Sequence, residues 1–206
     1  MGTRSRRFML IQKRLVSSKT FDMAPHQLSI SQNCRVIFGQ KSIEALPTVL
    51  PSMTKVLLVR DQQYDVRQLE YLVQCANLPS FTYTMEPPVC CVDSVNAGVA
   101  MAHRLGIDGI IGVGGGNVMD TARSIAALLT NSGNAEDYVM GNRMLSQEPA
   151  PHVIVPTIAG SGSEVSSEAL IYNEDVEAKV TLTPSPIIAH VSTAARNALI
   201  PRPQAF

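Results

Sequence analysis

The stretch GVGGGNVMDTARSIAALLTN, Gly112–Asn131, decides the fold of this chain. A short apolar run, Gly109–Val113, leads into three glycines, Gly114–Gly116, and then into a helical pattern from Asn117 to Thr130. Glycines let a phosphate approach the backbone, and the free N–H groups and dipole at a helix start attract an anion. The stretch predicts a strand, a phosphate-binding turn and a helix. A tight turn that needs glycine for positive φ is the alternative interpretation.

Short apolar runs alternate with helical patterns along the rest of the chain. Further strands are predicted at Cys34–Phe38, Lys55–Val59, Phe81–Met85 and His152–Val155. Further helices are predicted at Lys41–Leu50 with an interruption at Pro47, at Tyr64–Ala76, and from Asp93, which can cap its helix, to about Leu105. This alternation implies βαβ units. The predicted fold class is therefore α/β, a Rossmann-like parallel sheet with helices on both faces.

Ligands of such sheets bind beyond the carboxyl ends of the strands, and three segments fall there. One is the glycine-rich turn. Asp61, just past a strand, could accept hydrogen bonds from ribose hydroxyls and repel a 2′-phosphate, which favours NAD over NADP. A solvated loop acid is the alternative for Asp61. The third segment, Thr157–Ser163, carries hydroxyls and little bulk, which suits a second wall of a pyrophosphate or nicotinamide pocket, or else a flexible surface loop.

Two long motifs make the chain resemble the iron-containing (group III) alcohol dehydrogenases, a family that includes glycerol dehydrogenases and maleylacetate reductases. Its members carry segments like GGGSxxDxAKxIA and PTTAGTGSEVT. Here the segments read GGGNVMDTARSIA and PTIAGSGSEVS at a matching spacing, and the resemblance covers roughly Cys34 to Lys179. It implies an NAD(P)-dependent enzyme that transfers a hydride between an alcohol and a nicotinamide cofactor with metal assistance.

The resemblance also implies roles for single residues. Asn117 stands where the family has Ser, and Ile158 replaces a Thr, which removes one hydrogen bond to the cofactor. Asp120 matches the family's Asp, which we expect in the first turn of the helix, where it suits the dipole. Lys179 matches a lysine near the nucleotide. The predicted cofactor-binding residues are Asp61, Gly114, Gly115, Gly116, Asn117, Asp120, Thr157, Ser161 and Lys179.

The family's metal ligands, one Asp and three His, have no counterpart in this sequence. Most of them belong to a C-terminal helical domain, which we expect to be absent here. The last Asp is Asp175, Ala195 falls near the expected Asp, and the histidines are far apart: His26, His103, His152 and His190. We therefore expect Fe²⁺ or Zn²⁺ only in a full-length enzyme, no catalytic residue or metal ligand here, and an incomplete, inactive fragment. A stand-alone nucleotide-binding or interaction protein without catalysis is the alternative.

Residues 1–21 differ from the nucleotide-binding α/β domain that we assign to residues 30–206. They hold six basic residues and no acidic one: Arg4, Arg6, Arg7, Lys13, Arg14 and Lys19. This composition fits a mitochondrial transit peptide, or a plain basic tail on a cytoplasmic protein.

Charge and hydropathy limit the partners. The chain has 17 basic and 17 acidic residues, so nothing indicates nucleic acid. Apolar runs fall well short of the roughly 20 residues that a bilayer requires. The expected partner is a small alcohol or aldehyde, not nucleic acid or a membrane, and a homodimer is left open.

Overall fold

The computed structural model describes residues 34–50, 52–182 and 191–194. The chain divides into two units, 1–31 and 32–206, and every described residue belongs to the second unit. The predicted leader, residues 1–21, lies outside the described residues, as do His26, His190 and Ala195. The assignments made for these positions stay predictions.

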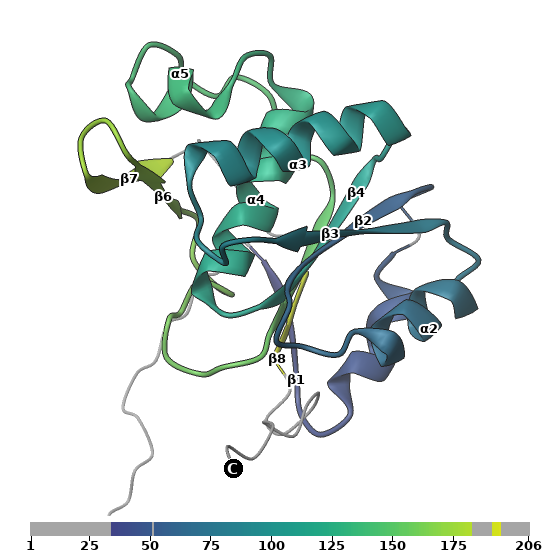
Figure 1. Ribbon diagram of the computed structural model, residues 1–206. Helices are drawn as coiled ribbons and strands as arrows, with labels where there is room; N and C mark the ends of the chain where they lie inside the picture. The colour runs from purple at the N-terminus through teal and green to yellow at the C-terminus, as the bar shows by residue number, and fades with distance from the viewer. Residues whose placement is uncertain (1–33, 51, 183–190, 195–206) are drawn as a thin grey trace, which may run out of the picture. The chain divides into compact units, whose positions relative to one another are not determined.

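A six-stranded parallel sheet forms the centre of the second unit (Figure 1). The strand order is β1-β8-β5-β4-β2-β3, and every pairing in it is parallel. The strands are β1 (Arg35–Phe38), β2 (Val56–Asp61), β3 (Ser80–Met85), β4 (Gly109–Gly114), β5 (His152–Pro156) and β8 (Val191–Ala194). The predicted α/β fold class is confirmed.

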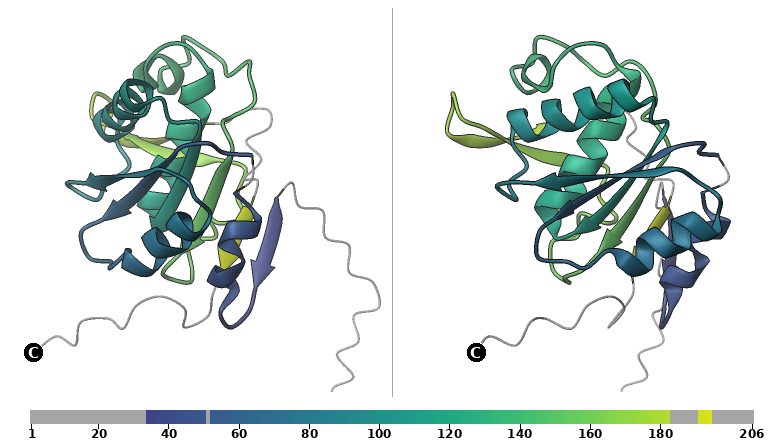
Figure 2. Two further views of the ribbon diagram at one scale, coloured as in Figure 1. Left: turned by 90° about the vertical axis from the view of Figure 1, so that its right-hand side faces the viewer. Right: turned by 45° about the vertical axis from the view of Figure 1, so that its right-hand side comes forward.

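Helices cover both faces of this sheet (Figure 2). One face carries α3 (Val92–Leu105), α4 (Gly116–Thr130) and α5 (Ala135–Val139), and the other carries η1 (Ser42–Thr48) and α2 (Arg67–Cys75). Successive side chains of a strand point to opposite faces. Accordingly, Leu57 of β2 packs in the core with α3 and α4, and Leu58 packs in the core with η1 and α2. A strand buried on both faces has to be apolar throughout, which explains the run KVLLV.

Two local details differ from the sequence-based expectations. The segment predicted as a short helix with an interruption at Pro47 forms a 3₁₀ helix, η1, that contains this proline. The helix α3 is not capped by Asp93. Its N-cap residue is Cys91, whose backbone N–H donates to the Oγ of Ser94 at 3.0 Å. A serine hydroxyl three residues into the helix thus satisfies the N–H of the N-cap residue, which is one half of a capping box.

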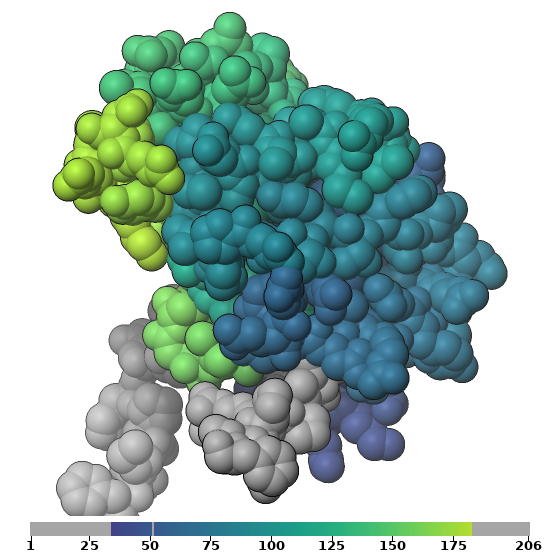
Figure 3. Space-filling view, in the orientation of Figure 1, coloured from purple at the N-terminus to yellow at the C-terminus, as the bar shows by residue number. Residues whose placement is uncertain are grey.

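A separate antiparallel hairpin, β6 (Ala169–Asn173) and β7 (Ala178–Leu182), was not predicted from the sequence. Ile171 and Leu182 join the core on the α4 side of the sheet, whereas most of the other hairpin residues are at least partly exposed. Because so few hairpin residues are buried, the alternation of apolar and polar residues along each strand is too short to predict strands from the sequence. The hairpin lies beside the start of α3 (Figure 3). In the described part of the chain, no helix is both long and apolar enough to cross a membrane.

Candidate functional site

The three segments predicted to bind a ligand lie at one edge of the sheet. The strands β5, β4 and β2 are parallel neighbours, so their carboxyl ends, Pro156, Gly114 and Asp61, lie next to one another. The strand order reverses here, because β3 follows β2 on one side while β4 returns to its other side. Open α/β sheets bind ligands at such a switch point. The sheet therefore brings the predicted segments together where a ligand is expected.

The glycine-rich turn does not need positive φ angles. Gly115 is the N-cap residue of α4, with φ of −80° and ψ of −172°. The glycines with positive φ in the described chain do not include any of Gly114–Gly116, but they do include Gly160 and Gly162 in the second loop. The alternative interpretation of the turn, glycine for positive φ, is therefore wrong for these three positions.

Close packing explains the glycines of the turn instead. A Cβ atom on Gly114 would lie 2.6 Å from the Cβ of Val118, which is an outright clash between β4 and α4. A Cβ atom on Gly115 would lie 3.1 Å from the Cδ1 of Ile158, the movable end of a side chain that is 42% exposed. Gly114 thus permits α4 to pack on β4. Gly115 has no side chain to cover its backbone, so another group can approach the backbone there.

The Thr157–Ser163 loop packs against this turn. The backbone N–H of Thr157 donates to the carbonyl oxygen of Gly114 at 3.0 Å. The Cβ of Ser161 would lie 3.2 Å from a Cβ atom on Gly116, so the serine sits over the glycine. The Oγ1 of Thr157 is buried without a hydrogen-bond partner. Buried hydroxyls nearly always have a partner, so this oxygen is of the kind that a bound ligand satisfies.

Lys179 and Asn117 are also brought together. The Nζ of Lys179 lies 3.5 Å from the Oδ1 of Asn117, and the Nδ2 of Asn117 donates to the carbonyl oxygen of Pro88 at 3.0 Å. Asn117 therefore links the start of α4 to β7 and to the loop after β3. The Lys179 side chain is exposed, so its ammonium group remains available to an anion at the N-terminus of α4.

Asp120 lies in the second turn of α4 and not in the first as expected, because the helix already begins at Gly116. It is 5% exposed, and its Oδ1 lies 3.5 Å from the Nη1 of Arg123, which is fully buried. Burial raises the pKa of Asp120, against the opposing effects of Arg123, the Leu170 N–H and the Ser163 hydroxyl. The contacts that the structure gives Asp120 are all with other residues of the protein. Because Asp120 lies beyond the first turn, the expected favourable interaction with the helix dipole does not apply.

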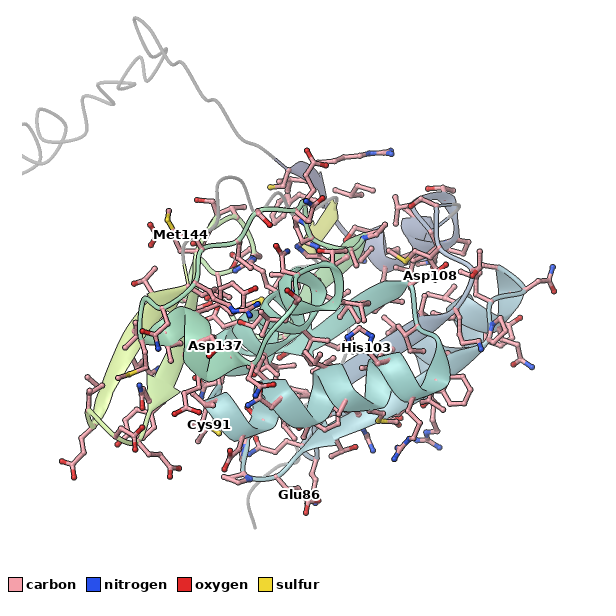
Figure 4. All side chains as sticks on the ribbon, turned by 90° about the horizontal axis from the view of Figure 1, so that it is seen from above. Glu86, Cys91, His103, Asp108, Asp137 and Met144 are labelled. Carbon is pink, nitrogen blue, oxygen red and sulfur yellow. The ribbon has the colours of Figure 1, made fainter. Side chains whose placement is uncertain are left out.

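Asp61 is the last residue of β2 rather than a loop residue. It is 8% exposed, and its Oδ1 accepts a hydrogen bond from the N–H of Gln63 at 2.9 Å. It is therefore not the solvated acid of the alternative interpretation. Asp61 lines a cavity of about 290 Å³ at the ends of β2 and β3 with Gln62, Gln63, Met85, Glu86, Pro87 and Pro88. Glu86 (labelled in Figure 4) brings a second carboxylate to this cavity, which sequence reasoning missed.

The described residues do not fit a metal centre. Within these ranges, no three His, Cys, Asp or Glu residues form a group that could hold a metal ion. His152 is buried in β5, where its Nδ1 lies 3.0 Å from the carbonyl oxygen of Ala150. The described residues therefore supply no ligand set for a metal-dependent step.

Comparisons with known sequences identify the relatives of the chain. The model of the family described as iron-containing alcohol dehydrogenase matches residues 33–194. Long-chain-alcohol dehydrogenase 1 of Geobacillus thermodenitrificans is 32% identical over 133 residues, which are 64% of this chain and 32% of that protein. Choline dehydrogenase of Bacillus subtilis is 38% identical over 105 residues, 50% of this chain and 25% of that protein.

Comparisons with solved structures agree on the fold. The NADH-dependent butanol dehydrogenase A of Thermotoga maritima superposes with a TM-score of 0.74 at 21% identity, over 82% of this chain and 44% of that one. The sulfoacetaldehyde reductase of Bifidobacterium kashiwanohense, in complex with NAD⁺, gives a TM-score of 0.73 at 18% identity, over 82% and 46%. The chain thus spans less than half the length of each of these four relatives.

Proposed function

Because this chain belongs to the iron-containing alcohol dehydrogenase family, we propose that it forms the nicotinamide-dinucleotide-binding part of an alcohol dehydrogenase. The observation that carries the proposal is the contact between the Gly114–Asn117 turn and the Thr157–Ser163 loop at the switch point of the sheet. The buried, unpartnered Oγ1 of Thr157 and the open backbone at Gly115 are the features that a bound dinucleotide would use.

The pyrophosphate is proposed to bind at the N-terminus of α4. This helix has 15 residues, and its first N–H groups carry the equivalent of roughly half a positive charge. Thr157 and Ser161 would add hydroxyl donors from the facing loop, and Lys179 would add an ammonium group from β7. Ile158 offers only an apolar contact at the position where the family motif has a hydroxyl.

The adenosine ribose is proposed to occupy the cavity beside Asp61. A carboxylate at the end of β2 can accept hydrogen bonds from both ribose hydroxyls. The Asx-type bond from the Gln63 N–H fixes one oxygen of Asp61 and holds the side chain in place. A 2′-phosphate would meet the carboxylates of Asp61 and Glu86, so NAD is the proposed cofactor in preference to NADP.

The proposed substrate is a small alcohol or the corresponding aldehyde. When bound, the nicotinamide ring accepts or donates the hydride, and the residues of this chain bind and orient it. The two relatives matched by sequence are named for long-chain alcohols and for choline, which is too broad a range to select one alcohol. Because the described residues provide no metal-ligand cluster, we expect the isolated chain to bind NADH without oxidising alcohols, even with added Fe²⁺ or Zn²⁺.

Titration of the purified chain with NADH, followed by nicotinamide fluorescence, tests the proposal. We expect saturable binding that ADP-ribose displaces, because both molecules share the pyrophosphate and the ribose. Circular dichroism of the same sample establishes that the chain is folded. A folded chain without saturable NADH binding would refute the proposed function.

A further inference from the structure

We propose that Arg123 is a positioning residue for the dinucleotide site, which holds the Thr157–Ser163 loop in place from inside the protein. This inference rests on the proposed function. Arg123 lies in the middle of α4, and its side chain is fully buried. An arginine is rarely buried unless its charge is paired and its donors are used.

The guanidinium group bonds to the end of the hydroxyl-bearing loop and to the segment that follows it. Its Nη2 donates to the carbonyl oxygen of Ser163, and its Nη1 donates to the carbonyl oxygen of Glu168 at 2.8 Å. The same Nη1 lies 3.5 Å from the Oδ1 of Asp120, one turn earlier in α4. One side chain thus fixes a loop end, a second backbone position and a carboxylate.

Asp120, the acidic partner of Arg123, lies near the same part of the chain. The Ser163 hydroxyl and the backbone N–H of Leu170 both act to lower the pKa of its carboxyl group, against the effect of burial. Ser163 is therefore bonded to α4 through its carbonyl oxygen and Arg123, and its hydroxyl favours the charged form of Asp120 in the same helix. The pair acts as one anchor for the carboxyl end of the loop.

The amino end of the loop has an anchor of its own, the hydrogen bond from the Thr157 N–H to the Gly114 carbonyl oxygen. Ser161 lies between the two anchors and over Gly116. The gap between this loop and the glycine-rich turn is consequently set by two attachments, one on β4 and one on the buried ion pair. Arg123 is fully buried, so it acts on a ligand through the loop and not by contact.

Arginine has the geometry that this anchor needs. A guanidinium group is planar and offers five N–H donors in fixed directions, so it can bond two carbonyl oxygens and a carboxylate at once. A lysine ammonium is a compact charge with three donors on a flexible stem. The family motif has Lys at this position, so the sequence signal for the anchor is a single Lys-to-Arg difference.

The test compares Arg123→Lys with the wild-type chain by amide hydrogen exchange without ligand and by NADH titration. Lysine keeps a positive charge beside Asp120 but lacks the rigid, planar set of donors that bonds both carbonyl oxygens in fixed directions. We expect exchange in peptides covering residues 157–168 to accelerate about tenfold, with exchange in β2 and β4 unchanged. NADH should bind about tenfold more weakly. Ser163→Ala removes the hydroxyl that favours the charged form of Asp120 but keeps the carbonyl oxygen that Arg123 bonds. It should accelerate exchange in the same peptides to a smaller degree and serves if Arg123→Lys does not fold.

Ile125→Val is the matched control on the same helix. Ile125 is fully buried but faces Gly98 of α3 and not the loop, so its truncation loosens the core elsewhere. The control should leave both loop exchange and NADH affinity at wild-type values. Wild-type loop exchange in Arg123→Lys and Ser163→Ala, or an increase spread evenly over the whole chain, would overturn the anchor. Failure of the wild-type chain to bind NADH would instead remove the proposed function, and the exchange data would still decide whether Arg123 holds the loop.

Discussion

The Nζ of Lys179 lies 3.5 Å from the Oδ1 of Asn117, although 62 positions separate these residues in the sequence. Lys179 belongs to β7 and Asn117 to the first turn of α4. The contact places an ammonium group beside the free N–H groups that begin this helix. Two sources of positive potential therefore coincide at the edge of the sheet where the pyrophosphate is proposed to bind.

Replacing this charge should weaken dinucleotide binding. We expect Lys179→Gln to reduce NADH affinity about tenfold, which corresponds to about 1.4 kcal/mol, and to reduce its dependence on salt. Arg104→Gln is the control, because Arg104 is also exposed but lies in the last turn of α3, which leads into the amino end of β4. Fluorescence titration at two salt concentrations measures both effects. Equal losses in the two variants would assign the effect to net charge rather than to position.

Gly115→Val should abolish dinucleotide binding and leave the fold intact. The φ and ψ of Gly115 are open to any residue, and its nearest neighbour is the movable end of Ile158, so valine can be accommodated in the protein. Valine would nevertheless fill the space over the turn. Ser80→Val, at the amino end of β3, is the control and should bind NADH like the wild type. Unchanged NADH affinity in Gly115→Val, with a native circular dichroism spectrum, would contradict the pyrophosphate assignment.

Asp61→Asn should relax the proposed preference for NADH over NADPH. Asparagine keeps an oxygen that can accept from the Gln63 N–H but removes the negative charge. Calorimetry measures the dissociation constants of NADPH and NADH. We expect the ratio of the NADPH constant to the NADH constant to fall about tenfold, because the repulsion of the 2′-phosphate is reduced. Asp65→Asn provides a control of equal charge change away from the cavity. Tighter binding of NADPH than NADH by the wild-type chain would refute the role of Asp61.

The carboxylate of Asp108 makes stability depend on pH (Asp108 is labelled in Figure 4). It accepts hydrogen bonds from the N–H groups of Thr54 and Lys55 and from the Thr54 hydroxyl. Burial raises the pKa of Asp108, but these hydrogen bonds outweigh that effect and hold it below its ordinary value. A lowered folded-state pKa stabilises the protein above the unfolded-state pKa of about 4, and the contribution is lost as the pH falls through the folded-state pKa.

Asp108→Asn is therefore expected to reduce the free energy of unfolding by about 1 kcal/mol at neutral pH, with a smaller difference in acid. Urea unfolding at about pH 7 and about pH 3 measures the two values. Glu174→Gln, at an exposed position, should be neutral at both. A difference between Asp108→Asn and the wild type that does not change with pH would show that the carboxylate charge is irrelevant.

We also propose that residues 1–21 direct import into mitochondria, because they are basic and contain no acidic residue. A fusion of residues 1–30 to a fluorescent protein should co-localise with a mitochondrial dye. Replacement of Arg4, Arg6 and Arg7 by Glu in the same fusion should abolish this localisation. Diffuse fluorescence of the unmodified fusion would count against the proposal.

Elements defined by local pattern could be predicted from the sequence. The apolar run at Gly109–Val113 predicted a strand, and β4 extends only one residue further, to Gly114. The three glycines and the helical pattern after them predicted the turn and α4, which begins one residue before the expected Asn117. These features depend on residues close together in the chain, where backbone sterics and side-chain periodicity suffice. Parallel strands then bring Asp61 and the two loops to one edge, so the place of the site followed from the topology.

Only the tertiary structure decided how the site is held together. Arg123 bonds to residues 40 and 45 positions later, and in the sequence its charge resembles that of a solvent-exposed helix position. The hairpin of β6 and β7 depends on packing against α4, and Glu86 reaches the cavity of Asp61 only because β3 pairs with β2. A buried ion pair is stable where its donors and acceptors converge from distant segments. That convergence is set by how the sheet and helices pack, which no local pattern in the sequence records.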